Sequence, residues 1–230
     1  MAEELTTTSY AILGLLAVKP WTTYELAQQM KRALGHFWPR AESNLYEEPK
    51  KLVALGLATS APDTVGKRPR TLYSITPEGR QALAAWMPTP AAGPVLEFEQ
   101  LVKVFFAEHG TRADLQATIE SARQWTEERL ATTIEIPRGY LRGEGPFPER
   151  LPWLILSGQF LKEFTLMVGR WADWAAEVVD EWPDDLRAAE PEWAALEAMA
   201  VDADAYLRRA ADERRAIART PRSDLDGLGG

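Results

Sequence analysis

Apolar residues recur three and four positions apart over most of this chain, which predicts a largely helical protein. Three helices are expected near the N-terminus, over residues 8–18, 22–34 and 41–54. The hydroxyl of Thr8 or Ser9 is suited to cap the first helix, and that of Thr22 or Thr23 the second. Gly56 is suited to end the third helix in the left-handed conformation.

The pattern changes to short strand candidates after the third helix, at Leu57–Ala61 and Thr71–Ile75. The segment between them, Pro62–Arg70, is too long for a tight hairpin and too basic for a core, so we expect it to be an exposed wing tip. Thr76 and Pro77 then suit the cap and first position of another helix. Helix, turn, helix, strand, basic loop and strand are typical of a winged helix, which presents one helix to a DNA groove and a hairpin to the backbone.

Beyond a Pro- and Gly-rich segment the pattern is entirely helical, apart from a long loop expected over 137–152. The predicted fold class is mainly α, with an N-terminal winged helix-turn-helix and an all-helical C-terminal dimerisation domain. The predicted domains are residues 1–87 for DNA binding, 88–96 as linker, 97–219 for dimerisation and an effector, and 220–230 as a disordered tail. The last two helices are expected over 154–182 and 190–219.

The helix expected over 154–182 carries an aromatic seam with spacings of three and four. Such a seam requires a partner helix, either within the chain or at the centre of a homodimer. The same aromatic side chains would alternatively line a pocket for a flat ligand. The residues assigned to this dimerisation surface or ligand pocket are Phe105, Phe160, Phe164, Met167, Trp171 and Trp174.

Charge is unevenly distributed along the 230 residues, whose net charge is −8. Residues 1–87 hold ten Lys/Arg and eight Asp/Glu, whereas the remainder holds sixteen and twenty-six. The acidic second half would repel phosphate, which leaves the first half as the DNA-binding face. The absence of Cys fits a reducing compartment, and the acidic N-terminus does not resemble a secretory signal. The most apolar stretch, 151–171, contains charged residues, so a cytoplasmic protein without a membrane span is expected.

The third helix and the wing contain the candidate DNA ligands. Asn44 suits bidentate contact with adenine, and Ser43 and Tyr46 can reach bases or phosphates. Lysines further along the helix and basic residues in the wing suit backbone phosphates, which give affinity without sequence information. The predicted DNA-binding residues are Thr22, Thr23, Tyr24, Ser43, Asn44, Tyr46, Lys50, Lys51, Lys67, Arg68 and Arg70.

Each of these assignments has a purely structural alternative. Basic residues in a loop also describe a solvated surface, Ser43 and Asn44 also describe helix caps, and Tyr46 at helical spacing with Leu52 also describes a core position. Pro49 inside the predicted third helix would remove an amide and kink the helix, at a cost of roughly 3 kcal/mol. Such a kink would bend the helix around the core, or it would separate a base-reading turn from a packing turn.

Four segments occur in order: TSYAILGLLAV, TTYELAQQM, NLYEEPKKLVALGLA and GKRPRTLYSITPEGRQAL. Together they resemble successive signatures of the PadR family of bacterial transcriptional regulators, over about the first 87 residues. The matching positions are Tyr24-Glu25-Leu26, Leu45-Tyr46, Leu55-Gly56-Leu57, Gly66-Lys67-Arg68 and Tyr73 with Thr76–Gly79. The stretch Leu101–Phe106 is similar to the family's C-terminal dimerisation domain. The sequence departs from the family at Pro69 and in the long helix after Pro191.

These features predict a DNA-binding transcriptional regulator, a repressor that binds an inverted-repeat operator as a homodimer. The implied partners are double-stranded DNA, a second copy of the chain and a small aromatic effector, with no cofactor, metal or membrane. The alternative is a winged-helix module for protein–protein interaction without specific DNA binding. An enzyme is not expected, because the chain has two His residues and no arrangement of nucleophile, His and acid.

Overall fold

The computed structural model describes residues 4–38, 46–65 and 68–219, without the side chains of residues 65, 68, 69 and 217–219. Contacts divide the chain into two compact units. One unit reaches to Leu96 and includes Leu156–Leu161. The other holds Glu97–Ile155 and continues from Lys162. Each unit is described by itself.

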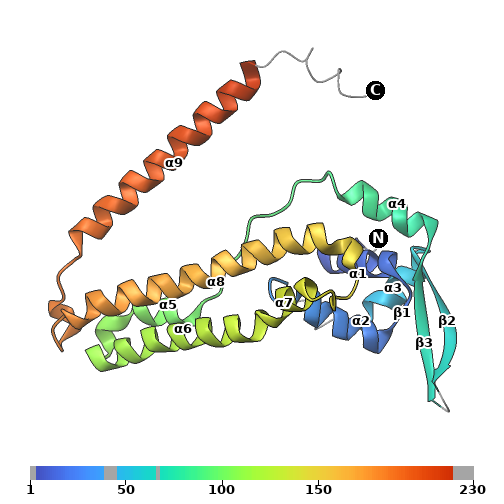
Figure 1. Cartoon of the computed structure of the whole chain (residues 1–230), viewed down its shortest axis with the longest axis horizontal. Coiled ribbons are helices and arrows are strands. Elements are labelled where there is room, and N and C mark those ends of the chain that lie inside the picture. The colour runs from blue at the N-terminus through green and yellow to red at the C-terminus, as the bar shows by residue number, and fades with distance from the viewer. Residues whose placement is uncertain (1–3, 39–45, 66–67, 220–230) are drawn as a thin grey trace. The chain divides into compact units, whose positions relative to one another are not determined.

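The first unit combines helices α1–α4 with a three-stranded antiparallel sheet (Figure 1). Its elements are α1 (Thr7–Val18), β1 (Trp21–Thr22), α2 (Thr23–Gln29), the π-helical turn η1 (Met30–Leu34), α3 (Glu48–Ala54), β2 (Ala58–Val65), β3 (Arg68–Ile75) and α4 (Pro77–Trp86). Strand β3 lies in the centre of the sheet, with β1 and β2 on either side. The prediction of a mainly helical chain with an N-terminal winged helix is confirmed.

The core of this unit is formed by apolar side chains from α1, α2 and α3. Ile12, Leu16, Leu26 and Leu52 are almost completely buried. The predicted cap of α1 was wrong by two positions or more, because Thr6 caps the helix and Ser9 lies inside it. The hydroxyl of Thr6 accepts from the Ser9 amide over 3.2 Å, and the Ser9 hydroxyl accepts from the Thr6 amide over 2.9 Å. This reciprocal pair satisfies two amides of the first turn.

The wing is a long hairpin, so the predicted strand limits and the nine-residue tip were wrong. Strand β2 continues to Val65 and β3 resumes at Arg68. Proline is disfavoured in strands, which is why Pro62 and Pro69 suggested a loop. Pro62 lies in the edge strand β2, and Pro69 lies in the part of β3 that extends beyond β1. Each of these prolines lies on a strand segment with one neighbouring strand. The amide that proline lacks can therefore fall on the open edge, where it would have no partner.

Helix α3 ends as predicted at Gly56, whose φ is 73°. The Leu57 amide donates to the Leu52 carbonyl and the Gly56 amide to the Val53 carbonyl, which is the Schellman arrangement. The other end differs from the prediction, because α3 begins at Glu48 and Pro49 lies in its first turn. An amide in the first turn has no acceptor within its helix, so Pro49 is tolerated there without a kink. Both interpretations of Pro49 as a kink were therefore wrong.

The second unit is helical throughout its regular structure. Its elements are α5 (Glu99–Phe105), the 3-10 turn η3 (Ala107–His109), α6 (Arg112–Thr133), α7 (Glu135–Leu141), the 3-10 turn η4 (Pro148–Arg150), α8 (Leu151–Asp180) apart from Leu156–Leu161, the 3-10 turn η5 (Leu186–Ala188) and α9 (Trp193–Arg219). Thr111 caps α6 as predicted. The loop expected over 137–152 was wrong, because α7 and η4 occupy much of it. Pro137 is accommodated in the first turn of α7, where its missing amide costs little.

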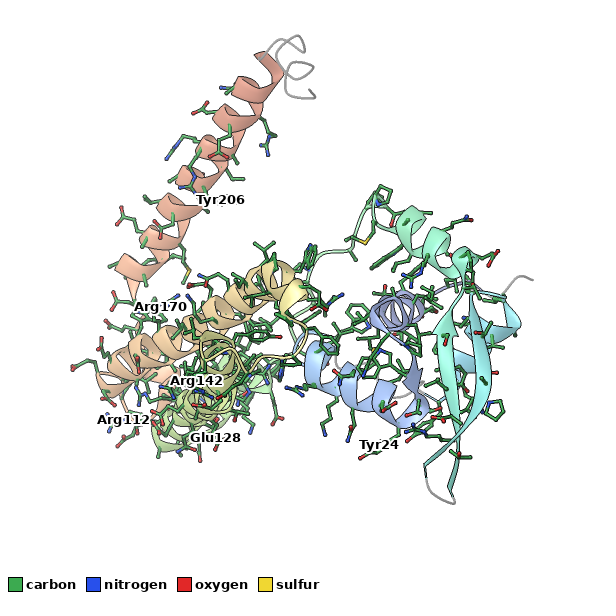
Figure 2. The ribbon with its side chains drawn as sticks, turned by 45° about the vertical axis from the view of Figure 1, so that its right-hand side comes forward. Tyr24, Arg112, Glu128, Arg142, Arg170 and Tyr206 are labelled. Carbon is green, nitrogen blue, oxygen red and sulfur yellow. The ribbon has the colours of Figure 1, made fainter. Side chains whose placement is uncertain are left out.

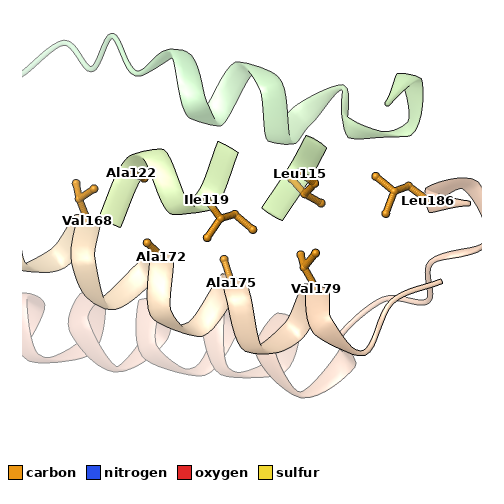
Figure 3. Packing of buried hydrophobic residues seen from close by; sticks show 8 residues of the cluster. All are labelled: Leu115, Ile119, Ala122, Val168, Ala172, Ala175, Val179 and Leu186. Carbon is orange, nitrogen blue, oxygen red and sulfur yellow. The ribbon is translucent and has the colours of Figure 1, made fainter. Parts of the chain in front are cut away.

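Helices α6 and α8 enclose the core of this unit (Figure 3). Its buried members are Leu115, Ile119, Ala122, Val168, Ala172, Ala175, Val179 and Leu186. The alanines allow the two helices to approach closely. The approach is close at Gly169, where an added Cβ would lie 2.9 Å from Cγ2 of Thr126.

Within the described ranges, no helix is both long enough and apolar enough to cross a bilayer.

Candidate nucleic-acid interface

A capping box closes the N-terminal end of α2. The Thr22 hydroxyl and the Thr22 amide each donate to Oε2 of Glu25 over 2.8 Å, and the Glu25 amide donates back to the hydroxyl over 3.3 Å. Hydrogen bonds from the Thr22 amide and then from its hydroxyl hold the pKa of Glu25 below its usual range. Thr22 is only 5% exposed. Its hydroxyl is therefore used inside the protein, and the predicted phosphate contact would require it to leave Glu25.

Two tyrosines of this unit present their rings to solvent. Tyr24 on α2 is 66% exposed, and Figure 2 shows its side chain directed away from the helix. Its hydroxyl accepts a hydrogen bond from Nε2 of Gln28 over 2.7 Å. Tyr46, in the turn that precedes α3, is 64% exposed. The alternative that Tyr46 belongs to the core was wrong, and both rings are accessible to a ligand. Thr23, beside Tyr24, is half-buried.

The two lysines of α3 differ in their surroundings. Nζ of Lys50 lies 2.8 Å from Oε1 of Glu47 on an exposed surface, and this hydrogen bond raises the pKa of Lys50. Nζ of Lys51 instead donates to the Glu4 carbonyl over 2.9 Å and lies 3.9 Å from Oε1 of Glu48. The side chain of Lys51 is largely covered. Lys50 is therefore the more accessible of the two lysines, and a phosphate that binds it competes with Glu47.

The described part of the wing carries one cross-strand ion pair. Asp63 on β2 faces Arg70 on β3, and Nε of Arg70 lies 2.6 Å from Oδ2 of Asp63. The Thr64 amide and the Arg70 side chain hold the pKa of Asp63 below its usual range. The carboxylate partly neutralises Arg70, so the wing is less basic than its Lys and Arg residues alone suggest.

Several predicted ligands lie outside the described residues, namely Ser43, Asn44 and Lys67, and Arg68 is described by its backbone only. The remaining ones belong to one compact unit, at the end of β1, on α2, on α3 with its preceding turn, and on β3. Their roles in DNA binding stay predictions.

One positioning contact was not predicted. The Ser9 hydroxyl on α1 donates to Oε2 of Glu48 over 2.8 Å, and both residues are buried. Glu48 belongs to a run of polar residues, which is typical of a solvent-exposed segment. No pattern in the sequence therefore indicated that Glu48 is buried. The contact joins α1 to the first turn of the helix whose preceding residues were assigned to base reading.

Helix α8 divides the predicted aromatic seam between two environments. Phe164 and Trp171 pack against the buried cluster, with edge-to-face contacts to Trp125 and Phe98 respectively. Four residues are substantially exposed: Phe105 on α5, and Phe160, Met167 and Trp174 on α8. Some side chains of the seam therefore lie in the core of the chain and others are exposed, and a role at the centre of a homodimer stays a prediction.

Two cavities lie in the helical unit, of about 330 and 360 Å³. The first lies between α5, η3 and α6, and Val102, Phe106 and Leu115 form apolar parts of its wall. None of the six residues assigned to the dimerisation surface or ligand pocket lines either cavity. Their assignment to a ligand pocket stays a prediction.

Two family patterns match this chain. The transcriptional regulator PadR-like family matches residues 12–85, and the virulence activator alpha C-terminal family matches residues 99–180. A negative transcriptional regulator from Bacillus subtilis, PadR, is 29% identical over 127 residues, which is 53% of this chain and 68% of that protein.

Solved structures share the fold. B. subtilis PadR in complex with operator DNA has a TM-score of 0.63 at 23% identity, covering 76% of this chain and 99% of that one. The same protein in complex with p-coumaric acid has a TM-score of 0.60 at 24% identity, covering 76% and 100%. The Vibrio cholerae virulence activator AphA has a TM-score of 0.53 at 25% identity, covering 76% and 97%.

Proposed function

The chain belongs to the PadR-like family of transcriptional regulators, and from that premise we propose that it binds promoter DNA as a homodimer. The observation that carries the proposal is the winged-helix unit, which falls in the family-matched region and exposes hydrogen-bonding and cationic side chains on α2, before α3 and on the wing. The similar structure of B. subtilis PadR with operator DNA supports this use of the fold.

The proposed contacts fall into two kinds. Tyr46 and Asn44, which precede α3 in the sequence, read base edges. Lys50 and Arg70, together with Lys67 and Arg68 of the wing, bind phosphates and contribute salt-dependent affinity. Tyr24 at the start of α2 donates a hydrogen bond from its hydroxyl to a phosphate. Carboxylates beside two of the cations, Glu47 and Asp63, must be displaced or outweighed when DNA binds.

A homodimer gives this unit its specificity. One winged helix reads a short half-site, and two-fold symmetry doubles the contact and matches an inverted repeat. The exposed apolar side chains of α8, Met167 and Trp174 among them, form the proposed dimerisation surface. We favour repression by occlusion of the promoter, in line with the negative regulator that is 29% identical to this chain.

The helical unit is also the proposed site of an effector, a flat aromatic molecule that changes the dimer and so changes DNA affinity. The similar structure with p-coumaric acid supports this class of ligand. A regulator of this kind acts on chromosomal DNA, so we place it in the cytoplasm and assign it no enzymatic activity. The competing function is protein–protein interaction alone, which would leave DNA affinity weak and unselective.

Fluorescence polarisation with duplex DNA from the promoter of its own gene tests the proposal. We expect specific binding at low salt that weakens steeply as salt rises, because bound phosphates release counterions. Arg70→Ala should weaken binding to every sequence and flatten the salt slope by about one ion. Arg138→Ala, an exposed arginine of the helical unit, is the matched control and should change neither. Absence of sequence-specific binding at low salt would overturn the proposal and favour the protein-interaction module.

The reading contacts have their own test. Asn44→Ala should change sequence preference in selection from random DNA, whereas Lys50→Ala should lower affinity and keep the preference. An unchanged selected sequence for Asn44→Ala would remove that residue from the reading role.

A further inference from the structure

Helix α9 carries an apolar stripe that neither the core of the chain nor the proposed DNA-binding function accounts for. Leu196, Met199, Ala203, Tyr206 and Ala210 follow one another at spacings of three and four, the repeat of a coiled coil. Leu196, Met199 and Tyr206 are 54%, 62% and 62% exposed. Figure 2 labels Tyr206 on this helix. A stripe with this repeat on a 27-residue helix is suited to pack against a partner helix.

The stripe lies outside the family-matched regions, which end at residues 85 and 180. It is also separate from the dimerisation surface proposed on α8. The partner of α9 must therefore be argued from the helix itself.

The charges of α9 are divided between its two halves. Residues 193–207 contain three carboxylates and no Lys or Arg, a net charge of −3. Residues 208–219 contain five arginines and two carboxylates, a net charge of +3. Two such helices attract when they run antiparallel, because each acidic half meets a basic half, and they repel when they run parallel.

We propose that α9 pairs antiparallel with α9 of a second copy of this chain. Asp202 and Arg209 are seven residues apart and occupy the same heptad position at the edge of the stripe. In an antiparallel pair this position lies opposite the same heptad position of the partner helix. The guanidinium of Arg209 lies 5.4 Å from the ring centre of Tyr206, which places it beside the stripe. In the register set by charge, Asp202 of each copy faces Arg209 of the other.

The same register matches side chains by size. It sets Met199 against Ala210 of the second copy, and Tyr206 against Ala203, so that a large residue meets a small one in the four central layers, while Leu196 faces Glu213 in the layer at either end. Parallel pairing would instead bring Arg209 beside Arg214 of the second copy. Size and charge therefore both favour the antiparallel arrangement. The pairing does not depend on DNA binding.

Charge reversal tests the pairing in the full chain by sedimentation equilibrium. Asp202→Arg sets an arginine against Arg209 of the second copy, and Arg209→Asp sets a carboxylate against Asp202. Each single variant should raise the dissociation constant for self-association roughly tenfold at low salt, and less at high salt. An equimolar mixture of the two single variants should recover wild-type affinity, because every facing pair is then of opposite charge. The double variant should recover it too.

Neighbouring residues supply matched controls. Arg208→Asp and Asp204→Arg make the same changes of charge on the outer face of the helix, and they should leave association unchanged. Helix content measured by circular dichroism checks that each variant folds. Unchanged association in both single variants, or a mixture that associates no better than either, would overturn the proposal. Tighter association of Arg209→Asp would overturn it as well, because only parallel pairing places that position beside Arg214.

Discussion

Ser9 on α1 donates a hydrogen bond from Oγ to Oε2 of Glu48 over 2.8 Å, across 39 residues of sequence. Ser9 is fully buried and Glu48 is 7% exposed. Glu48 opens α3, where a negative side chain also interacts favourably with the helix dipole. The position of α3 relative to α1 therefore depends on a polar contact inside an otherwise apolar core.

Glu48→Ala should lower the free energy of unfolding of the winged-helix unit by about 1–3 kcal/mol, because it removes the buried hydrogen bond that joins Ser9 on α1 to α3. Urea denaturation measures the change. Glu47→Ala removes an exposed carboxylate from the preceding position and should change stability by less than about 0.5 kcal/mol. Equal effects of the two substitutions would show that the buried hydrogen bond has no special role.

Thr22→Ala should cost about 1 kcal/mol, because it removes the cap of α2. The cap also makes stability depend on pH. The folded state lowers the pKa of Glu25, so this contribution is present above the unfolded pKa and is lost as pH falls through the lower folded value. Stability should therefore decline on acidification.

Glu25→Gln separates charge from hydrogen bonding in this cap, since Gln also forms a capping box. The variant should be somewhat less stable than wild type at neutral pH and should lose less stability on acidification. Thermal unfolding followed by circular dichroism between neutral and acid pH measures both. A pH dependence identical to that of wild type would assign the acid sensitivity to other carboxylates, such as Asp114 in the cap of α6.

Local patterns predicted those parts of the fold that are decided locally. Thr76, Thr111 and Gly56 cap their helices as expected, because a cap depends on a few adjacent residues. The strand limits could not be predicted, because Pro62 and Pro69 are disfavoured in strands unless one edge is open, and the pairing that opens that edge is tertiary.

The candidate site was predictable in its residue types and less so in its geometry. The exposed Tyr24 and Lys50 agree with a ligand-facing role. Lys51 has the same chemistry as Lys50 and lies beside it, yet it bonds to the Glu4 carbonyl. Which of two adjacent lysines faces solvent depends on how α3 packs, and no pattern in the sequence records that.

Asp63→Asn should strengthen binding to DNA of any sequence, because it frees Arg70 from its ion pair and removes a negative charge from the wing. The gain should be several-fold at low salt and should shrink as salt rises. Glu78→Gln, in the first turn of α4, makes the same change of charge away from the hairpin and serves as the control. Polarisation titrations at two salt concentrations distinguish the variants. A loss of affinity in Asp63→Asn would mean that the ion pair holds Arg70 in its DNA-binding position.

Two glycines of α8 should respond oppositely to the same substitution. At Gly169 an added Cβ would lie 2.9 Å from Cγ2 of Thr126 on α6, which is too close unless the helices separate. Gly169→Ala should therefore destabilise the helical unit by about 1–3 kcal/mol, less the gain in helix propensity. At Gly158 an added Cβ meets nothing within 4 Å, so Gly158→Ala should stabilise by up to about 1 kcal/mol. Urea denaturation of both variants gives the comparison. Stabilisation by both substitutions would show that α6 and α8 are not packed as closely as Gly169 and Thr126 indicate.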